Sequence, residues 1–328
     1  MTKSPPTGEW VSGQVAKRPV LWFFVLAVAT EILVMAMLVV TEADTRISEA
    51  LTVTGLPLKT DYLSAARLVW AVPGVLQAIL LVALQPLTPT IAAFAVTAMA
   101  WQRKGLKELI ARYRPWRVDV DWRQGLLSWA FCIGTFASMS LATAALNRLL
   151  LCADEYTWNQ DSLFFAWIPT ILIAMFLDGG GVGEETGWRG FAQPLLQRSR
   201  GPLVGTLLLG ILWSLWHIPA KPDLLLNGPS HFAIGFGIFT FRLIGLSVIM
   251  AYFFNRVGGS TLIAIAMHGL HNDSLGLQGQ LLSESDRVFV LSEITLLVPI
   301  VAVSVAIIVG TKGRLEDDAF AQAQHRAD

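Results

Sequence analysis

Charged residues are few in this sequence, and neither sign is in excess. Only 15% of the 328 residues are Asp, Glu, Lys or Arg, and 24 basic side chains balance 24 acidic ones. An ordinary soluble domain carries about 25% charged residues, so the composition argues against a soluble protein. A chain without net positive charge also lacks the electrostatic basis for nucleic-acid binding, and we expect no nucleic-acid partner.

Cysteine is scarce as well, with Cys132 and Cys152 as the only two in the chain. We expect both on one helix, where a separation of about 20 residues corresponds to roughly 30 Å along the axis. A disulfide needs Cα atoms within about 7 Å of each other, so this pair cannot be bridged. Neither cysteine has the spacing of a metal site such as C-x2-C.

Several catalytic motifs are missing. There is no H-E-x-x-H sequence, no G-x-S-x-G elbow and no Gly-Lys-Ser/Thr phosphate loop. A thermolysin-like zinc protease, a hydrolase with a nucleophile elbow and a P-loop enzyme are therefore unsupported. Asp178 is a single aspartate without an evident partner, so we do not expect an aspartyl dyad.

The chain instead contains many long hydrophobic segments. Hydrophobic residues make up 54% of it, and the mean hydropathy is +0.56. Runs of about 20 residues, enough to span the roughly 30 Å hydrocarbon layer as helices, recur along it. We predict an all-α, polytopic transmembrane bundle of about eight membrane-spanning helices, at 20–41, 64–84, 124–148, 162–179, 201–219, 232–254, 259–273 and 288–310.

Two of the apolar stretches need comment. The first run is too long for a signal-peptide core and lacks a clear cleavage site, so we expect a retained helix. The stretch 88–101, which follows Pro86 and includes Pro89, is open to three interpretations. It is a ninth span, a re-entrant piece or an extension of the second helix.

Basic residues concentrate in every second loop. They fill the segment from Arg103 to Arg123, follow the span 162–179 at Arg189, Arg198 and Arg200, and follow the last span at Lys312 and Arg314. The positive-inside rule assigns such loops to the cytoplasm. We also expect the amphipathic segment 105–113 to lie on that membrane surface.

The most informative motif is Gly183-Glu184-Glu185-Thr186-Gly187-Trp188-Arg189-Gly190, which follows an apolar run. Ionisable groups at membrane depth are costly unless they are paired, face a cavity or serve a function. On a helix, Glu185 and Arg189 are four residues apart and form an ion pair. Glu184 is rotated by about 100° from Glu185, so it is free to face other groups as a general base.

Two later clusters lie in similarly apolar settings. His217 ends the segment Trp213-Ser214-Leu215-Trp216-His217. His268 and Asn272 are four residues apart and project from one face of a short helix, where both can donate hydrogen bonds to a developing oxyanion. His271 lies on the same side and is a possible substitute for His268.

The ordered set of motifs resembles the CAAX protease and bacteriocin-processing (CPBP) family, which contains the type II CAAX prenyl endopeptidases. The motifs are Gly-Glu-Glu-x-Gly-Trp-Arg-Gly (an EExxxR motif), Trp-His-x-Pro and His-x-x-x-Asn, and the resemblance covers roughly residues 160–275. It implies an intramembrane endopeptidase whose substrates are peptides or membrane proteins in the lipid bilayer. It also implies an integral, multi-pass protein, of the plasma membrane if bacterial, with the active site towards the cytoplasm.

The resemblance also implies roles for the residues. Glu184 and His217 would activate a water molecule, His268 and Asn272 would hold the oxyanion, and Glu185 with Arg189 would brace the site. Such proteins have been interpreted both as zinc enzymes and as metal-independent glutamate proteases. Glu184, His217 and His268 are the ligands if zinc is present, but we favour a mechanism that requires no cofactor, because an Asn amide is a poor zinc ligand.

One position departs from the family pattern. Trp213 stands four residues before His217, where the family usually has Phe, and we expect this change to affect packing rather than chemistry. We divide the chain into N-terminal helices with a basic cytoplasmic loop (1–123), a catalytic helical core (124–280) and a final helix with a polar cytoplasmic tail (281–328).

Two other classes of function remain open at this point. A non-catalytic membrane scaffold or bacteriocin-immunity-type protein would use the same fold without cleavage. A transporter would use the mid-span charges Glu31 and Arg242 along a substrate path, although each charge could simply satisfy a neighbour.

Overall fold

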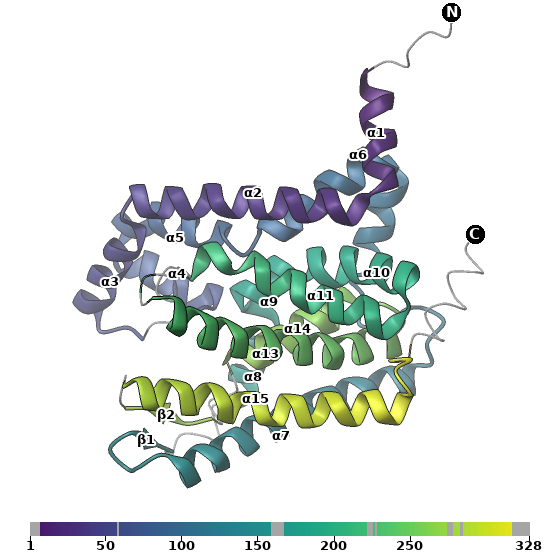
Figure 1. Cartoon of the computed structure of the whole chain (residues 1–328). Helices are drawn as coiled ribbons and strands as arrows, with labels where there is room; N and C mark the ends of the chain where they lie inside the picture. The colour runs from purple at the N-terminus through teal and green to yellow at the C-terminus, as the bar shows by residue number, and fades with distance from the viewer. Residues whose placement is uncertain are drawn as a thin grey trace, which may run out of the picture.

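The computed structural model of the chain describes residues 7–57, 59–158, 167–221, 226, 228–273, 278–282 and 285–316. Helices form nearly all of it, and most run side by side along one common direction (Figure 1). The all-α prediction is confirmed. The elements are α1 (Thr7–Lys17), α2 (Pro19–Val40), α3 (Ala43–Thr54), α4 (Tyr62–Ala71), η1 (Pro73–Val75), α5 (Leu76–Leu84), α6 (Thr88–Ile110), α7 (Trp122–Leu150), β1 (Tyr156–Thr157), α8 (Trp167–Leu177), α9 (Gly179–Glu185), η2 (Thr186–Ala192), α10 (Gln193–Arg200), α11 (Pro202–Trp216), η3 (Ile218–Ala220), α13 (Pro229–Arg256), α14 (Thr261–Asp273), β2 (Gln280–Leu281) and α15 (Asp286–Thr311).

Four of the described helices, α2, α7, α13 and α15, are long and apolar enough to cross a membrane. Their bounds agree with the predicted spans 20–41, 124–148, 232–254 and 288–310 to within a few residues. A bent pair, Pro73–Leu84 and Thr88–Ile110, meets the same test jointly, with an angle of 57° between its halves. In the described part of the chain, four helices are long enough to span a membrane alone, or five if the bent pair counts as one span, compared with about eight predicted spans.

The predicted span 64–84 is wrong, because two helices with a break between them occupy it. Helix α4 ends at Ala71, and the 3-10 turn η1 begins at Pro73. Proline has no backbone N–H and disfavours a helical residue before it, so the chain turns here. The stretch 88–101 is part of α6, a separate helix that joins α5 at the bend.

Three predicted spans correspond to helices too short to cross a bilayer alone. They are α8, α11 and α14. Residues 162–166 of the predicted span 162–179 lie outside the described residues. Helix α14 packs against α7, α8, α9 and α13, and its residues from Ile263 to Leu270 are buried. In contrast, outer helices expose large apolar side chains, such as Val40 of α2 at 83% and Leu127 of α7 at 67%. Helix α14 therefore lies in the interior, whereas α2 and α7 present apolar surface that lipid would cover.

The segment with the paired glutamates lies directly against the bend between α5 and α6. A Cβ atom at Gly183 would approach the backbone of Pro86 to 2.7 Å, and one at Gly187 would approach the Pro89 carbonyl oxygen to 2.6 Å. Real Cβ contacts are essentially never this short, so glycine at both positions allows the close approach of the two backbones. This contact fixes the position of Glu184 relative to α5 and α6.

The other sequence expectations have mixed outcomes. Cys152 lies beyond the end of α7 and not on it, but both cysteines are free, as the spacing predicts. Residues 105–110 continue α6 beyond a kink at Gln102, and the proposed membrane-surface location of 105–113 stays a prediction.

Both mid-span charges have partners. Glu31 accepts hydrogen bonds from Gln85 Nε2 at 2.7 Å and Thr88 Oγ1 at 3.1 Å. Arg242 donates to both carboxylate oxygens of Glu293 at 2.9–3.0 Å. The interpretation that each charge satisfies a neighbour is thus confirmed, and nothing in these contacts favours a transport path.

Candidate active site

Helix α9 brings both glutamates into the interior. Asp178 has an extended backbone and caps α9, because its carboxylate accepts from the Gly181 N–H at 2.6 Å. At the C-terminal end of α9, Glu184 and Glu185 are buried, with exposed fractions of 5% and 0%. The helix is interrupted at Asp178, and Gly179 to Gly183 are helical.

The motif continues as a short π-helical segment, η2, in which every residue is buried. Segments of this type are rare and occur frequently at functional sites. Arg189 in η2 donates to Glu185 Oε1 at 2.8 Å, and both side chains are fully buried. The guanidinium also donates to Ser247 Oγ at 3.3 Å and lies over the ring of Trp213 at 4.0 Å. The predicted Glu185–Arg189 pair is confirmed.

Glu185 has a second partner that the sequence does not predict. His268 Nδ1 lies 2.7 Å from Glu185 Oε1, and His268 Nε2 lies 4.0 Å from Glu184 Oε1. A carboxylate bound to one ring nitrogen fixes the imidazole and directs the other nitrogen to its target. With protons on both nitrogens, His268 donates to Glu185 through Nδ1 and presents Nε2–H beside Glu184.

Trp213 contacts Glu184 directly. Its indole Nε1–H donates to Glu184 Oε2 at 2.7 Å. The indole also packs edge-on against His268, with ring centroids 5.5 Å apart. Phenylalanine has no such donor. Trp213 therefore contacts Glu184 by a hydrogen bond as well as by packing, which a helical pattern does not show, and its effect on the chemistry stays a prediction.

His217 is not in contact with Glu184. Its Nδ1 lies 2.8 Å from the Trp213 carbonyl oxygen, one turn back on the same helix. Its ring packs against Trp216 and Phe239, with centroid distances of 4.7 and 5.1 Å. Among the described contacts, none joins His217 to the carboxylates. The remaining nitrogen, Nε2, is available for a water molecule or a substrate.

Asn272 and Asp178 form a second polar contact near Gly180. Asn272 Nδ2 donates to Asp178 Oδ1 at 3.1 Å, and Thr60 Oγ1 donates to Asp178 Oδ2 at 3.1 Å. Asp178 thus has partners that the sequence does not show, and its backbone also pairs with that of Asp61 in an isolated β-bridge. Among the described residues, no hydrogen bond joins the side chain of Asp178 to that of another aspartate.

Gly180 marks the point at which two candidate oxyanion donors meet. A Cβ atom there would lie 2.7 Å from His268 Nε2 and 3.1 Å from Asn272 Nδ2. The absence of a side chain leaves room for both nitrogens on one side of α9. Two N–H donors that converge on one small volume can stabilise a developing negative oxygen.

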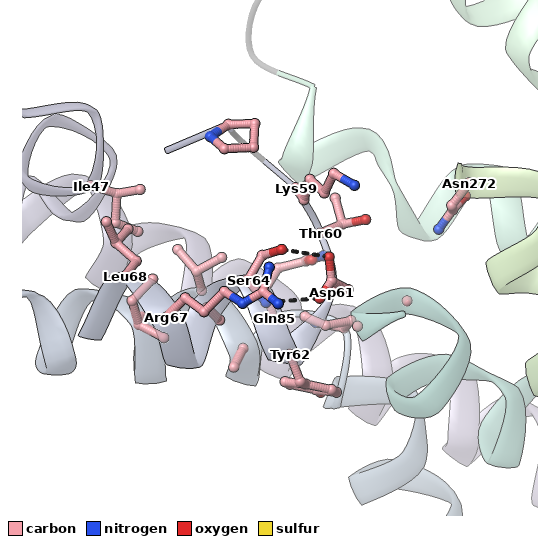
Figure 2. Close-up of a pocket in the computed structure, with 18 of the residues that line it drawn as sticks. Ile47, Lys59, Thr60, Asp61, Tyr62, Ser64, Arg67, Leu68, Gln85 and Asn272 are labelled. Atoms are coloured by element: carbon pink, nitrogen blue, oxygen red, sulfur yellow. Dashed lines mark hydrogen bonds between the residues drawn. The ribbon is translucent and has the colours of Figure 1, made fainter. Parts of the chain in front are cut away.

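A cavity of about 420 Å³ reaches this group of residues. Figure 2 shows that α3, α4 and the segment 59–61 line one part of it, with Asn272 on the other side. Glu184, Gly179 and Gly180 belong to its wall, whereas His217 and His268 do not. Its size and mixed lining are those of a ligand site. The remaining lining residues are mostly apolar and include Ile47, Leu51, Leu56, Leu68, Ile79 and Val82.

The candidate zinc ligands do not converge. The described residues contain no group of three or more His, Cys, Asp or Glu side chains placed to hold a metal ion. His217 Nδ1 is directed to a backbone carbonyl, and the Trp213 indole contacts the carboxylate that the imidazole would have to approach. Glu184, His217 and His268 therefore do not fit a zinc site in this arrangement, and we derive no step through a metal.

The Trp213 contact leads to a prediction that separates hydrogen bonding from packing. A hydrogen bond to a charged group contributes about 1.5–3 kcal/mol, so we expect Trp213→Phe to lower kcat about 10- to 100-fold, with KM nearly unchanged. Trp216→Phe is the matched control, because Trp216 is also buried on α11 and its indole nitrogen has no partner in the described structure. Equal losses in the two variants would reduce Trp213 to a packing role.

Comparison with known proteins gives a family for this part of the chain. Residues 162–273 match the model of the Rce1-like type II CAAX prenyl endopeptidase family. CAAX prenyl protease 2 of Methanococcus maripaludis is 30% identical over 95 residues, which are 27% of this chain and 34% of that protein. The match thus spans about a third of the length of that relative. The predicted family is confirmed for the segment that holds Glu184, His217, His268 and Asn272.

Proposed function

We propose that the Rce1-like segment makes this chain a membrane-embedded endopeptidase with Glu184 as its general base. The observation that carries the proposal is the position of Glu184. Its carboxylate lies in the wall of the cavity, and His268 Nε2 and Asn272 Nδ2 converge on the neighbouring Gly180. A base and two oxyanion donors on one side of a cavity are the components that hydrolysis of a peptide bond needs.

The reaction follows from these positions. Glu184 Oε1 takes a proton from a water molecule as the water oxygen bonds to the peptide carbonyl carbon. The carbonyl oxygen becomes negative and accepts from His268 Nε2–H and Asn272 Nδ2–H. The C–N bond then breaks, and Glu184 returns the proton to the leaving amine. No cofactor is needed in this sequence of steps.

The other polar residues hold these groups in place. Glu185 and Arg189 fix the orientation of His268, and Asp178 fixes Asn272. Trp213 holds the Oε2 atom of Glu184, which leaves Oε1 for the water. His217 belongs to the matched segment and is held by the Trp213 carbonyl and by packing against Phe239, but it does not line the cavity, so we assign it no step. The substrates that fit this proposal are peptides or membrane proteins whose apolar side chains fill the cavity.

Blocking the cavity tests this function. Ala65 lines the cavity on α4, whereas its neighbour Ala66 is exposed and does not line it. We expect Ala65→Trp to lower kcat/KM about tenfold or more, because small displacements of a substrate from its reactive position cost up to about 100-fold. Cleavage of quenched fluorescent peptides by protein in proteoliposomes provides the measurement.

Ala66→Trp is the matched control, with expected activity near that of the unmodified protein. Thermal unfolding of both variants shows whether the bulky side chain disturbs the fold. Equal activity of two folded variants would mean that substrate does not occupy this cavity.

A further inference from the structure

The basic residues that the sequence distributes over several loops meet at one end of the bundle. Arg117 N–H donates to the Val257 carbonyl at 3.0 Å, and Thr261 N–H donates to the Arg112 carbonyl at 2.9 Å. We call the end of the bundle where these segments meet the basic end. It is the right side of Figure 1, where α1, α10 and the C-terminus lie. Its cationic residues are Lys17, Arg18, Arg103, Lys104, Lys107, Arg112, Arg114, Arg117, Arg123, Arg198, Arg200, Arg256, Lys312 and Arg314.

The opposite end carries far fewer cations. We call it the distal end, and it holds α3, β1 and β2 on the left side of Figure 1. The positive-inside rule counts Lys and Arg near the ends of the spans, and Asp and Glu contribute little. Within the described residues, the Lys and Arg side chains of the distal end are Arg46, Lys59, Arg67, Arg148, Lys221 and Arg287.

The cavity lies towards the distal end. It is lined by α3, by α4 and by the chain between them, which joins the start of α9 through the hydrogen bond from Gly179 N–H to the Thr60 carbonyl. The exposed side chains of Lys59 and Arg67 belong to its lining. Helix α14 starts at the basic end and reaches Asn272 after eleven residues, or about 16 Å.

We propose that the cavity opens to the non-cytoplasmic face of the membrane and that substrate segments reach Glu184 from that face. The basic end is cytoplasmic by the positive-inside rule, and the cavity is at the other end. The sequence assigns the motif to the cytoplasm because Arg189, Arg198 and Arg200 follow a predicted span, and in the structure only Arg198 and Arg200 lie at the basic end. In the structure, Arg189 is a core residue and not part of a loop. The inference rests on the proposed function only in treating the cavity as the substrate site.

The class of substrate follows from this orientation. Peptides or the ends of membrane proteins that are exposed outside the cytoplasm can enter the cavity, whereas cytoplasmic C-termini cannot. Lys59 and Arg67 at the cavity would favour segments with a negative charge next to their apolar residues.

Labelling with a membrane-impermeant maleimide in intact cells tests the orientation with the full chain. Cys152 is exposed at the distal end, and Cys132 is buried, so the unmodified protein already carries one reporter. We expect Cys152 to react in intact cells. In a Cys152→Ser background, Lys59→Cys should react in the same way, and Arg200→Cys should lose labelling until the membrane is permeabilised.

The opposite pattern, with Arg200→Cys labelled in intact cells and Cys152 protected until permeabilisation, would overturn the proposal. Equal labelling of both ends in intact cells would overturn it too, since it indicates two orientations. Labelling does not depend on cleavage, so a correctly oriented chain without peptidase activity would refute the proposed function and leave the orientation intact. Because Cys152 is native, the result does not depend on a variant that fails to fold.

Discussion

A Glu184→Gln variant is expected to lose peptide-bond cleavage by about 10²- to 10⁴-fold, the contribution that general acid–base catalysis makes to rate. Glutamine has the shape of glutamate and keeps an oxygen that accepts from the Trp213 indole, whose bond to Glu184 Oε2 is 2.7 Å. It cannot take a proton from water, so the loss reports the base and not the packing. Rates of peptide cleavage in proteoliposomes provide the measurement.

The matched control is Glu155→Gln, the same change outside the bundle. Glu155 accepts from Arg287, and this hydrogen bond lowers the pKa of the Glu155 carboxyl. Loss of that surface pair should leave cleavage unchanged, because solvent screens exposed ion pairs and they contribute little to stability. Near-normal cleavage by a folded Glu184→Gln protein would refute the base. Retention of the cellular role by the same variant would instead favour a scaffold or immunity function.

A metal chelator separates the two mechanistic readings of the same site. The proposed steps use only side chains of this chain, so cleavage should persist in its presence. Loss of cleavage on chelation with recovery on addition of Zn²⁺ would contradict the metal-free mechanism. The Glu184→Gln result alone does not distinguish these readings, since a glutamate can serve as a zinc ligand or as a base.

The sequence predicts best what depends on neighbours along the chain. The Glu185–Arg189 pair follows from a four-residue spacing, and it survives in the structure even though η2 is π-helical. Long apolar runs likewise predict α2, α7, α13 and α15. These features need only local geometry or composition, so no knowledge of the packing is required.

The remaining parts of the site depend on packing between distant helices. The Trp213–Glu184 hydrogen bond joins α11 to α9, and the Asn272–Asp178 bond joins α14 to the residue before α9. No spacing in the sequence reveals which side chains meet across such interfaces. The cavity is a further example, because α3, α4, α5 and the segments that connect them form most of it and lie outside the segment 162–273 that matches the family.

Orientation illustrates the same limit. The positive-inside rule gives a correct orientation only if the spans are placed correctly. In the sequence, Arg189 is counted as a loop residue because the apolar run before it ends at Leu177. The break at Asp178 is a cap and not the end of the buried segment, since α9 and η2 continue through the interior. The cytoplasmic face expected from the sequence and the opposite face proposed from the structure therefore remain two predictions, which the labelling experiment separates.

An Arg189→Met variant is expected to lose about 3–5 kcal/mol of unfolding free energy, the usual cost of leaving one member of a buried ion pair without its partner. Arg189 and Glu185 are both fully buried at 2.8 Å, so no solvent can replace the guanidinium. His268 still contacts Glu185 but does not fill the same position. Thermal unfolding in detergent, followed by tryptophan fluorescence, would measure the loss.

Two further variants make that result interpretable. Arg287→Met removes the cation of a pair in which Arg287 is 55% exposed, so its cost should be much smaller than that of Arg189→Met. Glu185→Gln combined with Arg189→Met removes both buried charges while the amide oxygen still accepts from His268, so stability should recover substantially. If the double variant is no more stable than Arg189→Met, the loss comes from the volume and the Trp213 contact of the guanidinium. The double variant restores the fold but not the charges of Glu185 and Arg189. If its stability recovers and its cleavage does not, the charged pair is needed to hold His268 in its reactive position.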